Sequence, residues 1–216
     1  MTNLNLDRAR TAVLSMDIQK GPVRRSAMFR ERNVGQAAKS VLQAARRAGI
    51  VVIHIVIDHQ PAFYSAKNKF LQTVRIPILT APGVNVAELL EIVDEVKPVA
   101  EEPVIRKPRM NPFFGTALES MLRSRDIDTV VLMGVATEFV VEAAARHAAD
   151  ADFRVIVLED CCAAFSDEAH RVSLHIIDHL ATVATSTDFQ QRSDSFSLTA
   201  AARTCSSTRP RWSAPE

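Results

Sequence analysis

Six short apolar runs alternate with alanine-rich or amphipathic segments along the chain, and this alternation restricts the fold more than any other feature. A short run that is apolar throughout is typical of a strand buried on both faces. Strands that alternate with helices predict a parallel sheet covered on both sides, with right-handed crossovers. We therefore expect an α/β fold in three layers, α/β/α, built on a doubly wound six-stranded parallel sheet.

The expected elements follow from the apolar periodicity and from capping residues. Gly49 and Ser166 are natural helix caps, and Thr116 with Glu119 forms a predicted capping box. We expect strands at 12–16, 50–57, 103–106, 129–133, 153–158 and 181–184, and helices at 36–48, 86–96, 116–125, 139–149 and 167–180.

Two stretches do not fit the alternation. Residues 58–82 form a long irregular segment that carries Phe63, Tyr64 and Arg75, and a loop of this length in a compact domain is usually functional. From about Gln190 the chain is rich in Ser, Thr and Arg, without sustained periodicity. We therefore predict one domain over residues 1–189 and a mobile tail over 190–216.

Composition excludes several classes of protein. The 216 residues suit one domain, and a net charge of +1 gives no reason to expect a nucleic-acid or membrane partner. The chain has no apolar run that could span a bilayer, and residues 1–7 lack the basic start and apolar stretch expected of a signal peptide. Three cysteines, two of them adjacent, do not form a disulfide framework, so we expect a cytoplasmic protein.

The segment Gly134–Thr137 joins a predicted buried strand to a predicted helix. In an open parallel sheet such turns lie at the carboxyl ends of strands, where ligands bind. Asp17 ends the first predicted strand, and a buried carboxylate there needs either a partner or a chemical role. A cap or a salt bridge is the structural interpretation of Asp17, and a catalytic role is the functional one.

The turn resembles the nucleophile turn of the isochorismatase-like cysteine hydrolases, a family that includes nicotinamidases, N-carbamoylsarcosine amidases and isochorismatases. The shared pattern is Gly-Val-Ala-Thr, two residues, a Cys, an apolar residue and Glu, and this chain has Val140 at the Cys position. Asp17 with Gln19 matches the segment of the family's catalytic acid/base. Lys107, with Phe113 and Thr116, resembles the segment of its catalytic lysine.

The resemblance implies a sheet order of 3-2-1-4-5-6, with Asp17 and the Gly134 turn beside one crevice and Lys107 within reach. It also implies a cis peptide at Val135-Ala136. Asp17 and Lys107 are then the catalytic candidates. The candidates for contacting the substrate or its oxyanion, mainly through a backbone cradle, are Ala136, Thr137, Val140, Gln19 and Phe113. A homodimer or homotetramer acting on a small molecule is expected from the family.

Val140 leaves three interpretations open, because its side chain cannot form a covalent intermediate. First, true isochorismatases also lack the cysteine and cleave a vinyl ether, which would make Asp17 a general acid. Second, the fold could bind a small molecule, or assemble, without catalysis. Third, Cys161 or Cys162 could replace the nucleophile, although two cysteines after a buried strand are typically core residues. The first interpretation is our prediction: a hydrolase that uses Asp17 with Lys107.

No metal or other cofactor is predicted. The nicotinamidase-like members bind metal through an Asp and two His after the second strand, and here Asp58-His59 is followed by no second His. His175 and His179 have a spacing that can bind zinc, but the sequence offers no third ligand nearby. We expect both to be solvent-facing helix residues.

Overall fold

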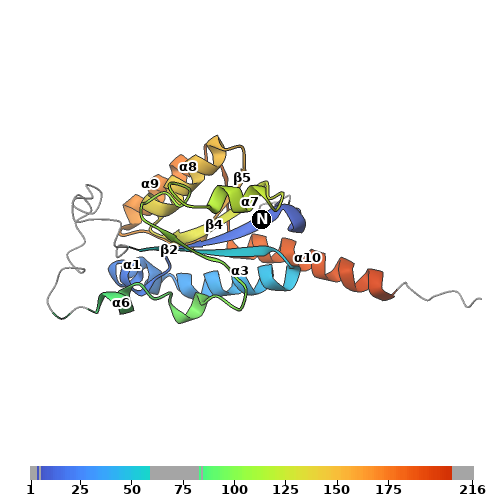
Figure 1. The fold of residues 1–216 in the computed structure, drawn as a ribbon, viewed down its shortest axis with the longest axis horizontal. Coiled ribbons are helices and arrows are strands. Elements are labelled where there is room, and N and C mark those ends of the chain that lie inside the picture. Colours follow the sequence, from blue (N-terminus) through green and yellow to red (C-terminus); the bar gives the residue numbers. More distant parts are fainter. Residues whose placement is uncertain (1–3, 5, 59–82, 84, 206–216) are drawn as a thin grey trace, which may run out of the picture.

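The computed structural model describes residues 4, 6–58, 83 and 85–205, with side chains to residue 196. One parallel sheet of six strands forms its centre, in the order β3-β2-β1-β4-β5-β6, as predicted (Figure 1). The strands are β1 (Thr11–Met16), β2 (Val51–Ile57), β3 (Val104–Lys107), β4 (Thr129–Val135), β5 (Arg154–Ala163) and β6 (Thr182–Ala184). The strand order reverses between β1 and β4, so this is the edge where a doubly wound sheet binds ligands.

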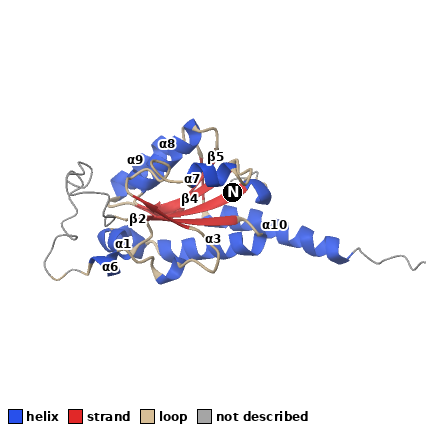
Figure 2. Cartoon of the chain, in the orientation of Figure 1, coloured by secondary structure: helices blue, strands red, loops and turns tan. Residues whose placement is uncertain are grey.

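Helices cover both faces of the sheet (Figure 2). One face carries α7 (Leu118–Arg123), α8 (Glu142–Asp150) and α9 (Asp167–Ile177). The other carries α1 (Lys20–Arg25), α3 (Val34–Ala48) and α10 (Ser186–Cys205). The shorter elements are η1 (Arg8–Arg10), α2 (Ala27–Glu31), α6 (Val86–Leu89), η2 (Asp94–Val96) and the π-helical η3 (Thr137–Val141).

Two apolar layers form the core, one on each face of the sheet. Successive side chains of a strand point to opposite faces, so Val13 packs in the layer under α3 while Leu14 packs in the layer under α8. Both strands at the centre, β1 and β4, are buried over their whole length. This two-sided burial explains why the predicted strands are apolar throughout rather than alternating.

Gly134 lies inside β4, one residue beyond the predicted end of that strand. It pairs with Met16 of β1, and a Cβ atom at Gly134 would lie 2.3 Å from the Met16 carbonyl oxygen. Any side chain there would separate the two central strands, so only glycine permits this close approach at the reversal point.

The predicted helix over 86–96 is wrong, because the structure divides that segment. It is helical only in α6 and in the short turn η2. Between them, Ile92 forms an antiparallel bridge with Gln19, and the Val93 N–H donates to the Ile18 carbonyl. These contacts with the chain after β1 hold the middle of the segment extended, although its periodicity is that of a helix.

The strand β5 is longer than predicted and continues through Cys161 and Cys162 to Ala163. Its pairing with β4 shifts between Leu132 and Gly134, where the register passes from Val157 to Cys162. The bulge absorbs the extra residues and lets polar Glu159 and Asp160 remain within a strand. The strand was predicted to end at residue 158 because the charged residues Glu159 and Asp160 follow it.

The chain beyond residue 189 differs from the predicted tail, because α10 continues to Cys205 and runs along α3 (Figure 1). Phe189 is fully buried, and Ser193 has no exposed surface either. Gln190 donates to the Ser40 hydroxyl at 2.9 Å, and Arg192 donates to the Leu6 carbonyl at 3.3 Å. Residues 190–196 therefore pack on the domain through polar contacts that apolar periodicity does not reveal. The last predicted tail residues, 206–216, lie outside the described part of the chain.

Capping was predicted with mixed success. Gly49 ends α3 with a φ of 70°, and the Ser166 side chain accepts from the Ala169 N–H, so both caps are confirmed. The predicted start of α7 at Thr116 is wrong, since the helix begins at Leu118. No helix within the described ranges is long and apolar enough to cross a membrane.

Candidate active site

Asp17 and Lys107 meet at the carboxyl edge of the sheet, although the strands that carry them are not neighbours. β2 lies between β1 and β3, which separates those two strands by about 10 Å. The Lys107 side chain spans this gap, and its Nζ lies 2.7 Å from Asp17 Oδ2. Nζ also donates to the Arg109 carbonyl at 3.0 Å. Both side chains are almost completely buried, with exposed fractions of 8% for Asp17 and 0% for Lys107.

One oxygen of Asp17 has no hydrogen-bond partner in the described part of the chain. Oδ2 contacts Lys107, whereas Oδ1 is buried and has no hydrogen-bond donor among the described residues. Burial raises the pKa of Asp17, and the attraction and hydrogen bond of Lys107 oppose this rise without cancelling it. Asp17 also has a φ of 54°, in the left-handed region that Asp tolerates better than most residues. A buried carboxyl group with a raised pKa and one unpaired oxygen can hold and transfer a proton.

The turn after β4 has the backbone that the resemblance implied. The peptide Val135-Ala136 is cis, and η3 begins directly after it at Thr137. The Ala136 carbonyl accepts from the N–H groups of Phe139 and Val141. The first N–H groups of a helix lack partners within it, so this segment can offer donors to a bound group. The Thr137 side chain is not part of such a cradle, because it is fully buried and its hydroxyl lies 2.8 Å from His170 Nδ1.

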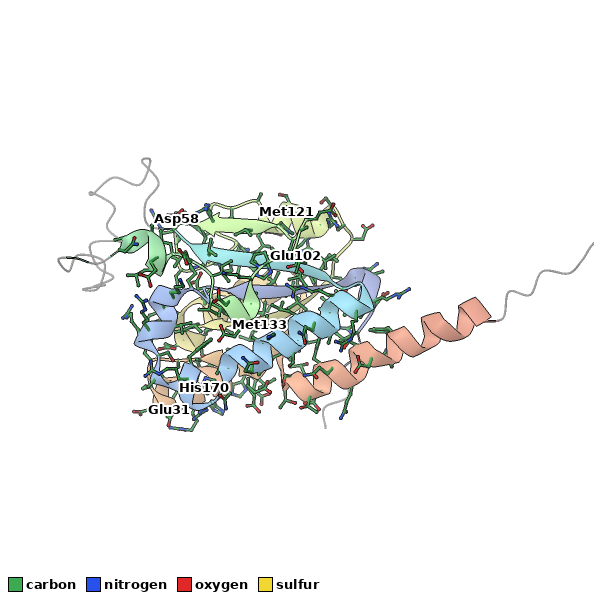
Figure 3. All side chains as sticks on the ribbon, turned by 90° about the horizontal axis from the view of Figure 1, so that it is seen from below. Glu31, Asp58, Glu102, Met121, Met133 and His170 are labelled. Carbon is green, nitrogen blue, oxygen red and sulfur yellow. The ribbon has the colours of Figure 1, made fainter. Side chains whose placement is uncertain are left out.

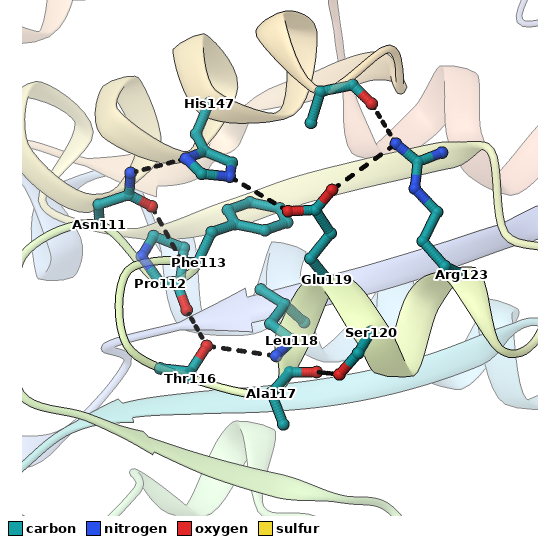
Figure 4. Close-up of polar contacts among 11 residues, drawn as sticks. Asn111, Pro112, Phe113, Thr116, Ala117, Leu118, Glu119, Ser120, Arg123 and His147 are labelled. Carbon is teal, nitrogen blue, oxygen red and sulfur yellow. Dashed lines mark hydrogen bonds and ion pairs between the residues drawn. The ribbon is translucent and has the colours of Figure 1, made fainter.

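Val140 and Phe113 belong to one apolar layer, on the α8 side of the sheet. Val140 is 1% exposed and Phe113 is 6% exposed. The Phe113 ring stacks on His147 with centroids 4.5 Å apart (Figure 4). The surroundings described for both side chains are therefore those of core residues, and a contact with substrate stays a prediction for each.

A polar chain fixes the segment around Phe113 (Figure 4). Asn111 accepts from the Phe113 N–H at 2.9 Å, and its amide group lies 3.2 Å from His147 Nδ1. Glu119 lies 3.6 Å from His147 Nε2 and pairs with Arg123, so it does not cap the helix. The Thr116 hydroxyl accepts from the Leu118 N–H at 3.2 Å, so the threonine half of the predicted capping box is present. The Glu119 half is absent, because His147 on α8 competes for its carboxylate.

Gln19 makes its described hydrogen bonds within the protein, and a contact with substrate stays a prediction. Its Nε2 donates to the carbonyls of Ile57 and Leu90, and its Oε1 accepts from the Ile57 N–H. Gln19 is fully buried. Its amide is thus occupied in joining the ends of β1 and β2 to the segment after α6. In this structure Gln19 holds the edge of the site together rather than pointing a free amide at a ligand.

Cys161 and Cys162 are poor candidates for a replacement nucleophile. Both lie within β5 and are buried, rather than at an open strand end. Burial raises the pKa of the Cys162 thiol to about 12, and burial with the nearby Asp160 carboxylate raises that of Cys161 well above its usual value. Since the thiolate is the reactive form, these shifts disfavour both thiols as nucleophiles near neutral pH.

His170 and Glu138 both hold the turn, and neither was predicted from the sequence. Glu138 Oε1 accepts from the Phe165 N–H at 3.1 Å. His170 lies on the buried face of α9 with Ser173 and Ile177, at positions i, i+3 and i+7. That spacing on a helix marks an inward position, so a polar residue there was a usable signal. Among the described residues no group of three His, Cys, Asp or Glu side chains could hold a metal ion.

Comparison with known proteins agrees with this fold. Residues 11–188 match the isochorismatase domain. The chain belongs to the isochorismatase family. Within that family it is 32% identical to the isochorismatase family protein YwoC of Bacillus subtilis over 179 residues, which cover 82% of this chain and 90% of YwoC. It is 30% identical to the maleamate amidohydrolase of Pseudomonas putida over 143 residues, 66% of each chain.

The fold of this isochorismatase-family member is also found in solved structures. A cysteine hydrolase from Pseudomonas syringae pv. phaseolicola superimposes with a TM-score of 0.77 at 25% identity, covering 89% of this chain and 96% of that one. The N-carbamoylsarcosine amidase of Thermoplasma acidophilum gives a TM-score of 0.62 at 26% identity, over 82% and 96% of the two chains. The relatives that carry a named activity here are hydrolases of C–N bonds or cysteine hydrolases.

Proposed function

We propose that this protein is an isochorismatase-family hydrolase that acts on a small molecule without a cysteine nucleophile. Asp17 is the general acid/base, and Lys107 is its charged partner. The observation that carries the proposal is the unequal environment of the two Asp17 oxygens. Oδ2 accepts from Lys107, whereas Oδ1 is buried and none of the residues that the structure describes donates to it.

Asp17 Oδ1 is the atom that can carry the transferable proton. Lys107 occupies Oδ2, and a proton on that oxygen would compete with the ammonium group for the same lone pairs. Burial raises the pKa of Asp17 despite Lys107, which favours the protonated acid at the start of the reaction. The acid donates its proton to the substrate as the scissile bond breaks. Water supplies the hydroxyl group of the product, and its other proton returns to Asp17.

Val140 supports a route without a covalent enzyme intermediate, because an isopropyl side chain has no lone pair. The buried thiols of Cys161 and Cys162, with their raised pKa values, support the same conclusion. Lys107 keeps a positive charge beside the carboxylate that forms when Asp17 has lost its proton. The Ala136–Val140 backbone would face negative charge that develops on the substrate.

The test is turnover of a panel of small vinyl ethers, amides and esters by the wild type and two carboxylate variants. The panel includes amides because ureidoacrylate and maleamate amidohydrolases are among the relatives. Asp17→Asn keeps the shape but cannot donate the acid proton, so kcat should fall by ~10²–10⁴-fold. Glu102→Gln is the matched control, since it changes a second buried carboxylate away from the site and should leave kcat within about twofold.

Two outcomes would contradict the proposal. If iodoacetamide inactivates the wild type and peptide mass spectrometry finds the label on Cys161 or Cys162, a thiol performs the chemistry. If no compound in the panel is turned over, and Asp17→Asn leaves binding of those compounds unchanged, the protein is a binding or assembly protein on this fold.

A further inference from the structure

Hydrogen bonds from residues that follow β5 hold the turn after β4. These residues lie on the β5 side of the turn, whereas the Asp17–Lys107 pair lies on its β1 side. The Thr137 hydroxyl lies 2.8 Å from His170 Nδ1 on α9, and both side chains are buried. A second bond joins the Phe165 N–H to Glu138 Oε1 at 3.1 Å. The first two residues after the Val135-Ala136 peptide are thus both held by side-chain bonds to one neighbouring segment.

The direction of the Thr137–His170 bond follows from what each group needs. Thr137 is fully buried, and His170 Nδ1 is the one hydrogen-bond partner of its hydroxyl among the described residues. A buried hydroxyl hydrogen without an acceptor is destabilising, so the hydroxyl donates and Nδ1 accepts. The ring proton is then on Nε2. Burial lowers the pKa of His170, and Arg32 lowers it further while Asp167 opposes both, which favours this neutral ring.

We propose that His170 is a positioning residue for the site, whose neutral ring accepts the Thr137 hydroxyl and thereby fixes the backbone from Ala136 to Val140. The inference rests on the proposed function only where it concerns turnover; the bond and its effect on the turn stand apart from it. His170 acts through Thr137 and does not contact the reacting atoms. Because a displacement of about 1 Å in a site can cost ~10²-fold in rate, such a bond can control catalysis.

Protonation of His170 reverses the bond. A second ring proton would place a donor on Nδ1 opposite the Thr137 hydroxyl, whose hydrogen would then lose its acceptor. The charged groups that act on the ring are Arg32, at the end of α2, and Asp167 on α9. Arg32 and Asp167 form an ion pair at 2.9 Å, so their charges largely offset each other. The proposal therefore predicts that the turn rearranges at acid pH as His170 titrates.

The experiment compares Thr137→Val and His170→Leu with the wild type by ¹⁵N NMR and by kinetics. Both variants should shift the amide resonances of residues 136–140. Thr137→Val should also change the ¹⁵N chemical shift of His170 Nδ1, because that nitrogen then no longer accepts a hydrogen bond. If the protein turns over a substrate, kcat should fall by ~10–100-fold with a smaller change in KM. Thr137→Ser restores the hydroxyl and should recover both readouts.

His175→Leu is the matched control, because His175 is an exposed histidine on the same helix, whose one ring contact in the described structure is with His179. It should leave the turn resonances and kcat unchanged. If His170→Leu fails to fold, His170→Asn replaces it, since the Asn amide oxygen can accept from Thr137 as Nδ1 does. Partial retention of the turn resonances is then expected.

Unchanged amide resonances at residues 136–140 in folded Thr137→Val and His170→Leu would overturn the proposal. So would a covalent substrate adduct on Thr137, because that would make the hydroxyl a nucleophile rather than an anchor. Failure of the proposed function looks different: no substrate is turned over, yet the resonances of the turn still move in both variants.

Discussion

Asp17 and Glu102 are two largely buried carboxylates on the same half of the sheet, and they differ in the number of donors that reach them. Asp17 has one cation on one oxygen. Glu102 accepts two bonds from the Arg46 guanidinium at 2.8 Å, one from the Val99 N–H at 3.0 Å, and lies 3.0 Å from His54 Nε2. Figure 3 shows Glu102 beside the middle of β2, away from Asp58 at the carboxyl end of that strand.

The pKa of each group reflects this difference. Burial raises the pKa of Glu102, but its hydrogen bonds and the charge of Arg46 outweigh burial and lower the pKa to about 2. For Asp17 the balance is reversed, and burial prevails over Lys107. A buried carboxylate surrounded by donors is locked in its charged form and stabilises the fold. A buried carboxylate with few hydrogen-bond donors can exchange a proton, and a general acid must be able to do so.

The largest expected effect is that of Lys107→Met, which removes the cation that pairs with Asp17 in the described structure. Losing one partner of a buried ion pair typically costs about 3–5 kcal/mol. Adding Asp17→Asn to this variant should recover a large part of that loss, since no buried charge then remains. Urea unfolding of the single and double variants measures the coupling. Additive losses would show that Asp17 does not depend on Lys107.

A smaller effect is expected for Glu102→Gln. The side-chain amide keeps the volume but turns one acceptor into a donor facing Arg46 or His54, so the free energy of unfolding should fall by about 2 kcal/mol. Activity should not change, because Glu102 lies away from the Asp17–Lys107 pair. A loss of turnover as large as that of Asp17→Asn would remove the distinction between the structural carboxylate and the functional one.

The pH dependence of stability should also separate the two carboxylates, which should act with opposite sign. The pKa of Glu102 is lowered on folding, so its stabilisation is present above pH 4.5 and is lost as the pH falls toward 2. The pKa of Asp17 is raised, so its stabilisation is present below pH 3.8 and is lost as the pH rises through the folded value.

Urea unfolding at a series of pH values from 2 to 7 checks this difference. Glu102→Gln should flatten the loss of stability between pH 4.5 and 2. Asp17→Asn should gain stability relative to the wild type as the pH rises above 3.8. The same slope for both variants would contradict the opposite pKa shifts.

The fold could be predicted from sequence because burial of a parallel sheet on both faces imposes a strong local pattern. Runs such as Thr129–Met133 are apolar throughout, and the helices between them carry one apolar face. Where the sequence erred, a distant partner opposed the local preference. The bridge from Gln19 to Ile92 interrupted a periodic helix, and Glu119 turned to His147 instead of capping α7.

The sequence by itself determined the family, the sheet and the two charged residues that meet at its edge, because strand ends and turn motifs are local features of the chain. Only the tertiary structure decided how those charges behave. Residues far apart in sequence decide three features of the site and its surroundings. These are the Asp17 oxygen without a described donor, the several donors to the Glu102 carboxylate, and the bond from Thr137 to His170. Burial and hydrogen-bond supply are properties of the packed molecule, and they set the pKa values on which the chemistry depends.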